Sequence, residues 1–453
     1  MERAHQKHVL VLITNPFAVI NVIHSGLMAE LGKHYRITVM SDLLTTAEIE
    51  RFNRHFKLDM HWLHTPFPPI SKFAKWLRAI QMLFFGHFFG LETIRIKVME
   101  RGAVLHWLFC ISRKNLALTY LTGSLVVIIR NSLIRRTMLH GFHTSVAGAN
   151  FHAVISTSPL DLRENAITNS LKVRGALCVS MIISWDNLTS KGVINAKSDL
   201  VLVWNNKMAV EYQQLYSMFS ENAAVRISGI PRFDAYSRKL ADQDVHLHKL
   251  SGVDSSKRVI LFTTGAVKHH SCQKYIIEDL LRYAKIRPDI AILVRCHPGD
   301  NLRRYDCFKS VRNLHICQPF GQGGSIIPPV DFLEKLHCQL ARCQVCVQIA
   351  STMLLDASAM GKPCISIAYD AHPGLHYISS VKRFYDYSHQ LMLPDCLKAN
   401  RVHSRGELFA TLDQALAGTC QTTGIENAAT SFIHHGAPNA VGLTAHCVRE
   451  WLG

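Results

Sequence analysis

Short apolar runs alternate with amphipathic stretches along most of the chain. Residues 8–15 (HVLVLITN) form a continuous apolar run that ends in turn-forming residues, which is typical of a strand covered on both faces. The next stretch carries Leu27, Met28 and Leu31 at helical spacing, and residues 35–42 (YRITVMSD) form a second apolar run. Strand, helix and strand in this order predict a right-handed parallel crossover. Further strands are expected at residues 151–158, 176–184 and 199–205.

A second series of apolar runs begins near residue 258, with helical patterns between the runs. The strands expected in this series are residues 257–265, 291–299, 314–319, 343–350 and 363–370. The two series predict an α/β fold of two Rossmann-like, doubly wound parallel-sheet domains that face a cleft.

The polar stretch between the two series lacks a core pattern and sets the expected domain boundaries. We expect a first domain over residues 1–236, a linker over 237–257 and a second domain over 258–420. Residues 421–453 would form a C-terminal tail or helix, for which a return to the first domain is one option.

An insertion at residues 71–143 differs from both series, with 11 Lys or Arg against two Glu. Its stretch KFAKWLRAIQMLFF gathers apolar residues on one helical face and basic residues elsewhere, as in a helix that lies in a membrane interface. An ordinary core helix with a solvated basic face is the alternative. The longest uncharged run, residues 115–129, is shorter than the roughly 20 residues that span a bilayer. We therefore expect a membrane-facing helical insertion in peripheral contact with an anionic membrane. The predicted apolar face consists of Phe73, Trp76, Leu77, Ile80 and Phe84.

The formal charge of +17 indicates a phosphate-bearing substrate, an anionic membrane or a nucleic acid as partner. The close cysteine pair Cys343 and Cys346 has no second pair to complete a zinc site, so we expect no metal site and reduced thiols in the cytoplasm. The first apolar run is broken at Asn15 and Pro16 and lacks a cleavage pattern, which argues against a secretory leader.

Polar residues stand at the ends of three expected strands in the second series, where ligands bind in open parallel sheets. They are Thr264 and Gly265, followed by Lys268; His297 and Pro298; and Ser351 and Thr352.

Ser351 and Thr352 open an expected helix, whose unsatisfied N–H groups and dipole favour a phosphate or diphosphate. Capping alone is the alternative. Asp356 lies one turn further, where it could accept hydrogen bonds from ribose hydroxyls or simply be an exposed helical carboxylate. His297, at the edge of the sheet, could donate to a phosphate or a base, or have a structural role.

At residues 351–363, STMLLDASAMGKP follows the pattern S-T-x-x-x-[ED]-A-x-x-x-G-K-P, with Asp356 where Glu is more usual. Together with His297-Pro298, SWDNLTSKG (184–192) and SGIPRFDAY (228–236), it resembles the GT-B glycosyltransferases of bacterial surface polysaccharides. That group includes CDP-glycerol glycerophosphotransferases and sialyl- and Kdo-transferases. The resemblance covers roughly residues 150–420, and the first 150 residues match only in general layout.

The resemblance implies that a nucleotide-sugar donor binds the second domain, that the acceptor enters from the first, and that neither metal nor cofactor is required. Leaving-group charge would be balanced by the helix start, by His297, and by Lys268 or Arg295. Candidates for the catalytic base are His24 and Asp186; a first-turn helix residue and a turn former are the respective alternatives.

Three functions remain open. The first is a metal-independent glycosyltransferase that moves a sugar or polyol phosphate to a lipid-linked or glycan acceptor at the inner face of the cell membrane. The second is a non-hydrolysing nucleotide-sugar 2-epimerase, for which we find no convincing set of acidic residues. The third is a non-enzymatic binder of anionic polymers; no zinc finger or RNP-like motif supports specific nucleic-acid binding.

Overall fold

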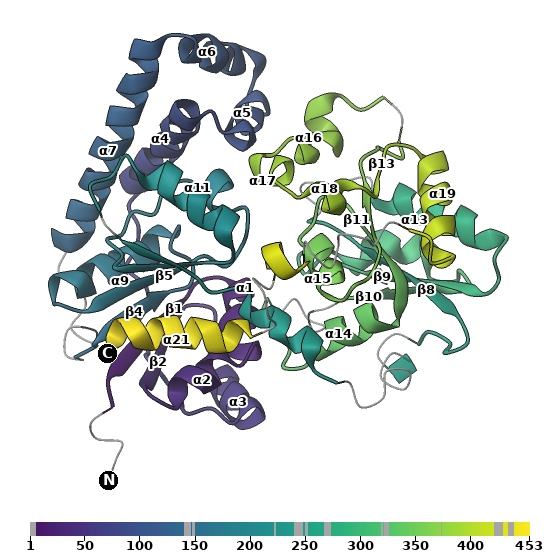
Figure 1. Ribbon diagram of the computed structural model, residues 1–453, viewed down its shortest axis with the longest axis horizontal. Helices are drawn as coiled ribbons and strands as arrows, with labels where there is room; N and C mark the ends of the chain where they lie inside the picture. Colours follow the sequence, from purple (N-terminus) through teal and green to yellow (C-terminus); the bar gives the residue numbers. More distant parts are fainter. Residues whose placement is uncertain are drawn as a thin grey trace. The chain divides into compact units, whose positions relative to one another are not determined.

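The chain divides into two compact units, residues 1–234 with 437–453 and residues 235–436 (Figure 1). Part of the expected linker, residues 240–247, 250 and 251, lies outside the described residues. The computed structural model describes residues 6–139, 146, 150–221, 223–239, 248–249, 252–266, 273–318, 320, 326–372, 374–420, 429–433 and 439–453.

The first unit is built on a seven-stranded sheet in the order β3-β2-β1-β4-β5-β6-β7, in which all neighbours are parallel. The order reverses between β1 and β4, which makes the carboxyl ends of these strands the switch point of the sheet. The strands are β1 (His8–Ile13), β2 (Arg36–Ser41), β3 (Met60–Trp62), β4 (Ala153–Ser156), β5 (Leu177–Met181), β6 (Leu200–Val203) and β7 (Ala224–Ile227).

Helices cover this sheet and follow most of its strands. The first begins at Pro16, where the side chain of Asn15 accepts a hydrogen bond from the N–H of Phe17. The helices are α1 (Pro16–Val19), the π segment Ile20–His24, α2 (Leu27–Gly32), α3 (Thr46–Phe56), α4 (Lys72–Phe89), α5 (Glu92–Met99), α6 (Ala103–Arg113), α7 (Leu116–Leu139), α9 (Leu162–Val173), α10 (Asn187–Ser190), α11 (Asn206–Tyr216) and α21 (Ala440–Leu452).

The second unit has a six-stranded sheet, β10-β9-β8-β11-β12-β13, again with all neighbours parallel. Its central strands are almost wholly buried, which explains their continuous apolar sequences. The strands are β8 (Arg258–Thr263), β9 (Ile290–Arg295), β10 (Leu314–Cys317), β11 (Cys343–Gln348), β12 (Cys364–Ile367) and β13 (Arg401–Val402). The principal helices are α13 (Gln273–Lys285), α14 (Phe332–Arg342), α15 (Met353–Ala359), α16 (Lys382–Tyr385), α17 (Ser388–Leu391), α18 (Asp395–Lys398) and α19 (Arg405–Leu416), and 3₁₀ segments occupy Pro231–Ser237, Leu302–Phe308 and Tyr377–Ser379.

Two doubly wound parallel sheets confirm the predicted fold class. Every apolar run singled out in the sequence contains a strand, and Cys343 and Cys346 lie buried in β11. The strands that the sequence did not predict, β3, β7 and β13, are short and lie at sheet edges.

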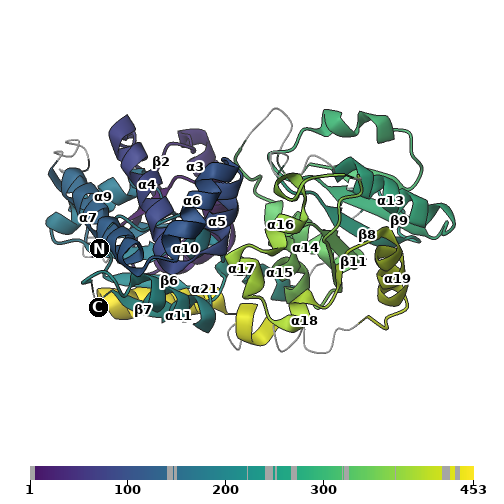
Figure 2. The same cartoon turned by 90° about the horizontal axis from the view of Figure 1, so that it is seen from above.

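Helices α4 to α7 lie between β3 and β4 and gather at one end of the first unit (Figures 1 and 2). Within the predicted apolar face of α4, Leu77, Ile80 and Phe84 pack against a buried cluster. Phe73 and Trp76 remain exposed, at 47% and 57%. Most of this face therefore serves the core of the helical group, in line with the alternative interpretation. The cluster is formed by Ile129, Leu133 and Leu162.

The C-terminal helix α21 belongs to the first unit and packs against α2. The carboxylate of Asp234 accepts hydrogen bonds from the N–H groups of Ala440 (2.9 Å) and Val441 (2.8 Å), where a negative charge is favourable. At the other end, the Lys7 ammonium donates to the carbonyl oxygen of Gly453 at 2.6 Å. Residues 439–453 thus return to the first unit, whereas residues 421–428 and 434–438 lie outside the described residues.

Candidate active site

A hydrogen-bond network joins the loops that follow β8 and β9 in the second unit. The hydroxyl of Thr264 accepts a hydrogen bond from the N–H of His297 (2.8 Å) and donates one to the carboxylate of Asp300 (3.0 Å). Asp300 is buried and also accepts from the hydroxyl of Tyr305 at 2.6 Å. The network fixes the His-Pro turn at the carboxyl edge of the sheet.

The imidazole of His297 is oriented by its own turn. Its Nδ1 accepts a hydrogen bond from the N–H of Gly299 at 3.0 Å. In the neutral ring the proton then resides on Nε2, because Nδ1 acts as the acceptor. His297 and Pro298 are both partly exposed, so a ligand at this edge can reach them.

Gly265 lies at the same edge, in the loop between β8 and α13. Its N–H donates to the side chain of Gln273 (2.5 Å), and its carbonyl oxygen accepts from that side chain (3.0 Å). The paired bonds hold the loop after β8 against the first turn of α13. Lys268, the predicted cation of this loop, lies outside the described residues.

Ser351 and Thr352 stand between β11 and α15, and both are partly exposed. Ser351 accepts a hydrogen bond from the N–H of Met353 at 3.3 Å, whereas the Thr352 side chain makes no capping bond. Capping therefore accounts for one hydroxyl of the pair only. Ala350, just before them, has φ +44°, a conformation that costs a non-glycine residue about 1 kcal/mol. The strand β11 neighbours β8, so this loop lies at the same edge as Thr264.

Asp356 and Arg295 are buried inside the second unit, 1% and 5% exposed. The hydroxyl of Tyr236 donates to Asp356, so a ribose hydroxyl would have to replace that contact. The Arg295 guanidinium donates to Gln339 at 2.7 Å and lies 5.0 Å from the ring centroid of Phe332. Burial lowers the pKa of Arg295. The interpretation of Asp356 as an exposed helical carboxylate is wrong.

The two candidate bases of the first unit have different surroundings. His24 ends the π segment, is 3% exposed, and has its ring centroid 5.4 Å from that of Phe52 and 5.2 Å from that of Phe56. The carboxylate of Asp186 accepts from Ser190 at 2.8 Å and lies 3.7 Å from the Lys191 ammonium. The side chain of Asp186 remains 23% exposed, so it is the more accessible of the two.

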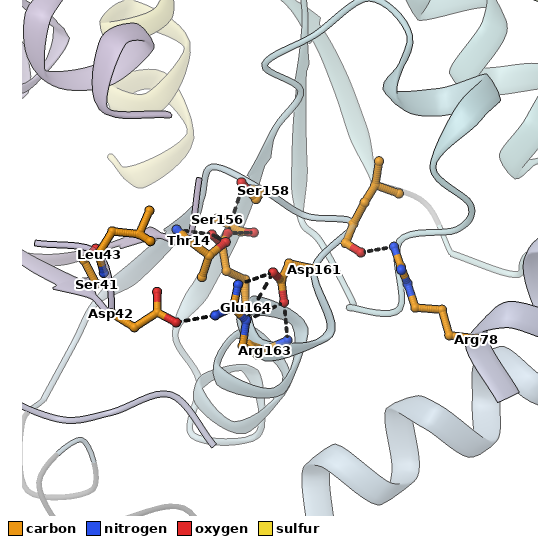
Figure 3. Close-up of polar contacts among 11 residues, drawn as sticks. Thr14, Ser41, Asp42, Leu43, Arg78, Ser156, Ser158, Asp161, Arg163 and Glu164 are labelled. Atoms are coloured by element: carbon orange, nitrogen blue, oxygen red, sulfur yellow. Dashed lines mark hydrogen bonds and ion pairs between the residues drawn. The ribbon is translucent and has the colours of Figure 1, made fainter. Parts of the chain in front are cut away.

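Sequence reasoning missed a carboxylate at the switch point of the first sheet (Figure 3). Glu164 of α9 is fully buried, and each of its oxygens accepts two hydrogen bonds. The first oxygen accepts from the N–H (3.1 Å) and hydroxyl (2.6 Å) of Thr14; the second accepts from the hydroxyl of Ser156 (2.7 Å) and the N–H of Ser158 (2.8 Å). Burial raises the pKa of Glu164 to about 7, against the effect of these donors. Glu164 thereby links the carboxyl ends of β1 and β4 through hydrogen bonds.

Beside Glu164, Arg163 connects two acidic residues at the same edge (Figure 3). Its guanidinium contacts Asp161 at 2.7 Å and also pairs with Asp42, which follows β2. The hydrogen bond with Asp161 raises the pKa of Arg163. A run of polar residues after an apolar strand, here Ser156 to Ser158, is the sequence signal that could have located this edge.

Basic residues of α4 and α5 bond backbone carbonyl oxygens in loops of the first unit. Arg78 donates to the carbonyl oxygens of Leu160 and Lys191, the latter at 3.0 Å, and burial lowers its pKa. Lys97 donates to the carbonyl oxygen of Ser190 at 2.7 Å. These cations hold loops of the first unit in place, so they do not contribute to a basic surface. Among the described residues, no group of three or more His, Cys, Asp or Glu is arranged to hold a metal ion.

No protein-family model matches the chain, and no curated protein matches it. Solved structures do match over nearly its whole length. The UDP-GlcNAc 2-epimerase of Neisseria meningitidis, bound to UDP-GlcNAc, has a TM-score of 0.55 at 13% identity, covering 98% of this chain and 100% of that chain. The Methanocaldococcus jannaschii enzyme of the same name, in complex with UDP-GlcNAc and UDP, has a TM-score of 0.55 at 11% identity, covering 98% of this chain and 99% of that chain.

A transferase is also among the matches. The glycotransferase of kitacinnamycin has a TM-score of 0.52 at 8% identity, covering 99% of both chains. At these identities the likeness shows the fold alone. The protein thus has the GT-B fold, two parallel-sheet α/β units of seven and six strands, that these nucleotide-sugar enzymes share.

Proposed function

We propose that the protein is a metal-independent glycosyltransferase that uses a nucleotide-activated donor. The observation that carries the proposal is the carboxyl edge of the second sheet, where the His297 turn after β9 and the Ser351-Thr352 pair after β11 lie on either side of β8. Polar groups at this edge of a doubly wound sheet are placed where such folds bind ligands. The GT-B fold of the matching nucleotide-sugar enzymes supports the same assignment.

In this proposal the donor binds through hydrogen-bond donors. The hydroxyls of Ser351 and Thr352 contact the phosphates, and Nε2–H of His297 donates to a phosphate or to the base. Lys268 is the candidate cation for the leaving group. Arg295 supports phosphate binding without touching the ligand, because its buried positive charge favours an anion near these loops.

Of the two candidate bases, we propose Asp186 for an inverting transfer. A general base must reach the proton of the acceptor hydroxyl, and the carboxylate of Asp186 is 23% exposed, whereas His24 is 3% exposed between two phenylalanine rings. The acceptor would be a glycan or a lipid-linked saccharide presented at the inner face of the cell membrane, in cell-surface polysaccharide synthesis.

A non-hydrolysing 2-epimerase is the second candidate, and the matching epimerases favour it. Epimerisation requires carboxylates or other groups that are available to take up and return protons. At the switch point of the first sheet, Glu164 is buried with four donors, and Asp42 and Asp161 are paired with Arg163. Asp186, proposed above as the transferase base, is engaged in a similar way with Ser190 and Lys191, so engagement alone does not distinguish the two candidates.

Incubation with nucleotide sugars separates the two candidates. Without an acceptor, a transferase leaves the sugar's stereochemistry unchanged, whereas a 2-epimerase produces the C2 epimer, which NMR detects. With polysaccharide or lipid-linked acceptors, we expect nucleotide release that a chelator does not inhibit. Appearance of the epimer in the absence of acceptor would overturn the proposal.

A variant pair tests the donor site in the same assay. Replacing Ser351 and Thr352 together by Ala should lower activity by at least about 100-fold, as expected for the loss of two hydrogen bonds to a charged group. The matched control, Ser256→Ala with Thr419→Ala, removes two exposed hydroxyls elsewhere in the second unit and should leave activity unchanged.

A further inference from the structure

The outer end of the helical group in the first unit exposes an apolar surface that no other described part of the chain covers. We define the tip surface as six large side chains of α6 and the start of α7, each more than half exposed. In Figure 1, α6 lies at the outer end of α4 to α7. The six are Val104 (73%), Trp107 (59%), Leu108 (51%), Leu116 (74%), Tyr120 (68%) and Leu121 (52%).

Polar groups of the same helices face inward. His87 of α4 is buried, and its ring nitrogens bond the hydroxyls of Ser112 on α6 (2.9 Å) and Thr122 on α7 (3.1 Å). A Cβ at Gly123 would lie 2.7 Å from the ring of Phe88, so α7 packs closely on α4 here. A helix pair in water buries its apolar side chains and exposes its polar ones. Here large apolar side chains are exposed while the polar group of His87 is buried, as in helices that face lipid.

Charges around the tip surface favour an anionic partner. Arg101, Arg113 and Lys114 are exposed at the ends of α6. The exposed carboxylate next to them in sequence is Glu100, and the sequence then has no Asp or Glu before Asp161. Apolar and aromatic side chains flanked by Lys and Arg have the composition of an interfacial membrane-binding surface.

The inner part of α7 belongs to the first unit. By length and composition the described stretch Leu116–Met138, 23 residues, could cross a membrane, and 33% of its most apolar window is buried. Arg130, within it, is 3% exposed and pairs with Glu221 at 2.6 Å. The Arg130 guanidinium also donates to the carbonyl oxygens of Ile194 (2.9 Å) and Ala196 (3.0 Å). A spanning orientation would break these contacts, so only the outer part of α7 is available to lipid.

We propose that the tip surface inserts into the interfacial region of a membrane that contains anionic lipid. This proposal identifies the part of the proposed enzyme that contacts the membrane, but it rests only on exposure and charge within the first unit. It also moves the contact from the α4 face that the sequence favoured, most of which is packed, to α6 and α7. Trp107 and Leu121 enter the lipid, while Arg101 and Lys114 remain among the headgroups.

Vesicle flotation of the full chain tests the proposal. We expect binding to phosphatidylcholine vesicles that contain phosphatidylglycerol, and weaker binding to phosphatidylcholine alone or at high salt. Trp107→Glu with Leu121→Glu should lower the partition coefficient at least about 10-fold, because two apolar side chains no longer leave water. The control, Val173→Glu with Val210→Glu, replaces apolar residues that are 63% and 50% exposed elsewhere in the first unit and should bind like the unmodified protein.

Brominated lipids identify which surface enters the membrane. Trp107→Phe should remove most of the tryptophan quenching, whereas Trp76→Phe should not, although Trp76 is 57% exposed on α4. The reverse quenching pattern would overturn the proposal. So would equal flotation of the Trp107/Leu121 variant and the unmodified protein, or a dimer of the unmodified protein that this variant dissociates. Nucleotide binding, measured in parallel, should be unchanged in the tip variants, so failure of the membrane contact and failure of the donor site are distinguishable.

Discussion

The carboxylate of Glu164 is bonded twice to Thr14, at 3.1 Å to its backbone N–H and at 2.6 Å to its hydroxyl. Because Thr14 follows β1 and the other two donors belong to the end of β4 and the loop after it, one buried carboxyl group organises the switch point of the first sheet. Burial raises the pKa of this carboxyl group to about 7, and its four hydrogen-bond donors act in the opposite direction.

Replacing Glu164 by Gln should destabilise the first unit by about 1–3 kcal/mol, because the amide N–H₂ would face the backbone N–H of Thr14 or of Ser158, which cannot become an acceptor. Thermal unfolding at pH 8 measures the effect. The matched control is Glu211→Gln, a buried glutamate of α11, which should be neutral or stabilising since burial dominates the pKa of Glu211. Equal stability of Glu164→Gln and the unmodified protein would show that the carboxylate is not required.

The pH dependence of stability should contain a contribution from Glu211. Burial raises the pKa of Glu211 from 4.5 to about 7. Between these values the unfolded chain has lost a proton that the folded chain retains, so stability falls as pH rises and levels off above about pH 7. The loss amounts to at most roughly 3 kcal/mol.

Thermal unfolding of the unmodified protein and of Glu211→Gln from about pH 5 to pH 8 checks this assignment. The variant should lose part of the slope and gain relative stability toward pH 8. Parallel curves would indicate that Glu211 does not titrate in this range.

Thr264 should matter through its hydroxyl, since that group accepts from the N–H of His297 and donates to Asp300. Thr264→Val keeps the shape but removes one donor to the buried carboxylate of Asp300 and the acceptor of the His297 N–H, so we expect a loss of about 1–3 kcal/mol and at least about 10-fold weaker nucleotide binding. Thr264→Ser retains the hydroxyl and should bind nearly normally. Calorimetric titration measures both, and equal affinities would exclude a positioning role for Thr264.

Arg130→Met should destabilise the first unit by roughly 3–5 kcal/mol, because it leaves two buried carbonyl oxygens and the partly exposed carboxylate of Glu221 without their donor. Arg135→Met, at an exposed position of the same helix, should change stability by less than about 0.5 kcal/mol. Urea unfolding compares the two. If both variants were equally stable, the inner part of α7 would not be anchored as described.

The sequence predicts the central strands because burial on both faces requires continuous apolar residues, as in residues 8–15 and 343–350. The edge strands β3, β7 and β13 were missed, since MHW, AVRI and RV are too short and mixed to show a period. The polar residues at the strand ends of the second unit could also be located, because the position follows from the strand boundaries.

Side-chain burial of charged residues was not predictable. Glu164 has polar neighbours in the sequence, as on a solvated face, whereas Asp356 and Arg130 follow apolar residues. In all three cases the burial of the charged side chain depends on tertiary contacts. The α4 face illustrates the converse, because apolar residues at helical spacing fit a membrane surface and a protein core equally well.

Calorimetric titration of the full chain with nucleotide diphosphates tests the central claim most directly, that the hydroxyls of Ser351 and Thr352 hold donor phosphates at the carboxyl edge of the second sheet. We predict saturable binding of at least one of UDP, CDP and GDP, and a fall in affinity of at least about 100-fold when both hydroxyls are removed, with the Ser256/Thr419 control unaffected. Undiminished affinity in the Ser351→Ala, Thr352→Ala variant would contradict the account.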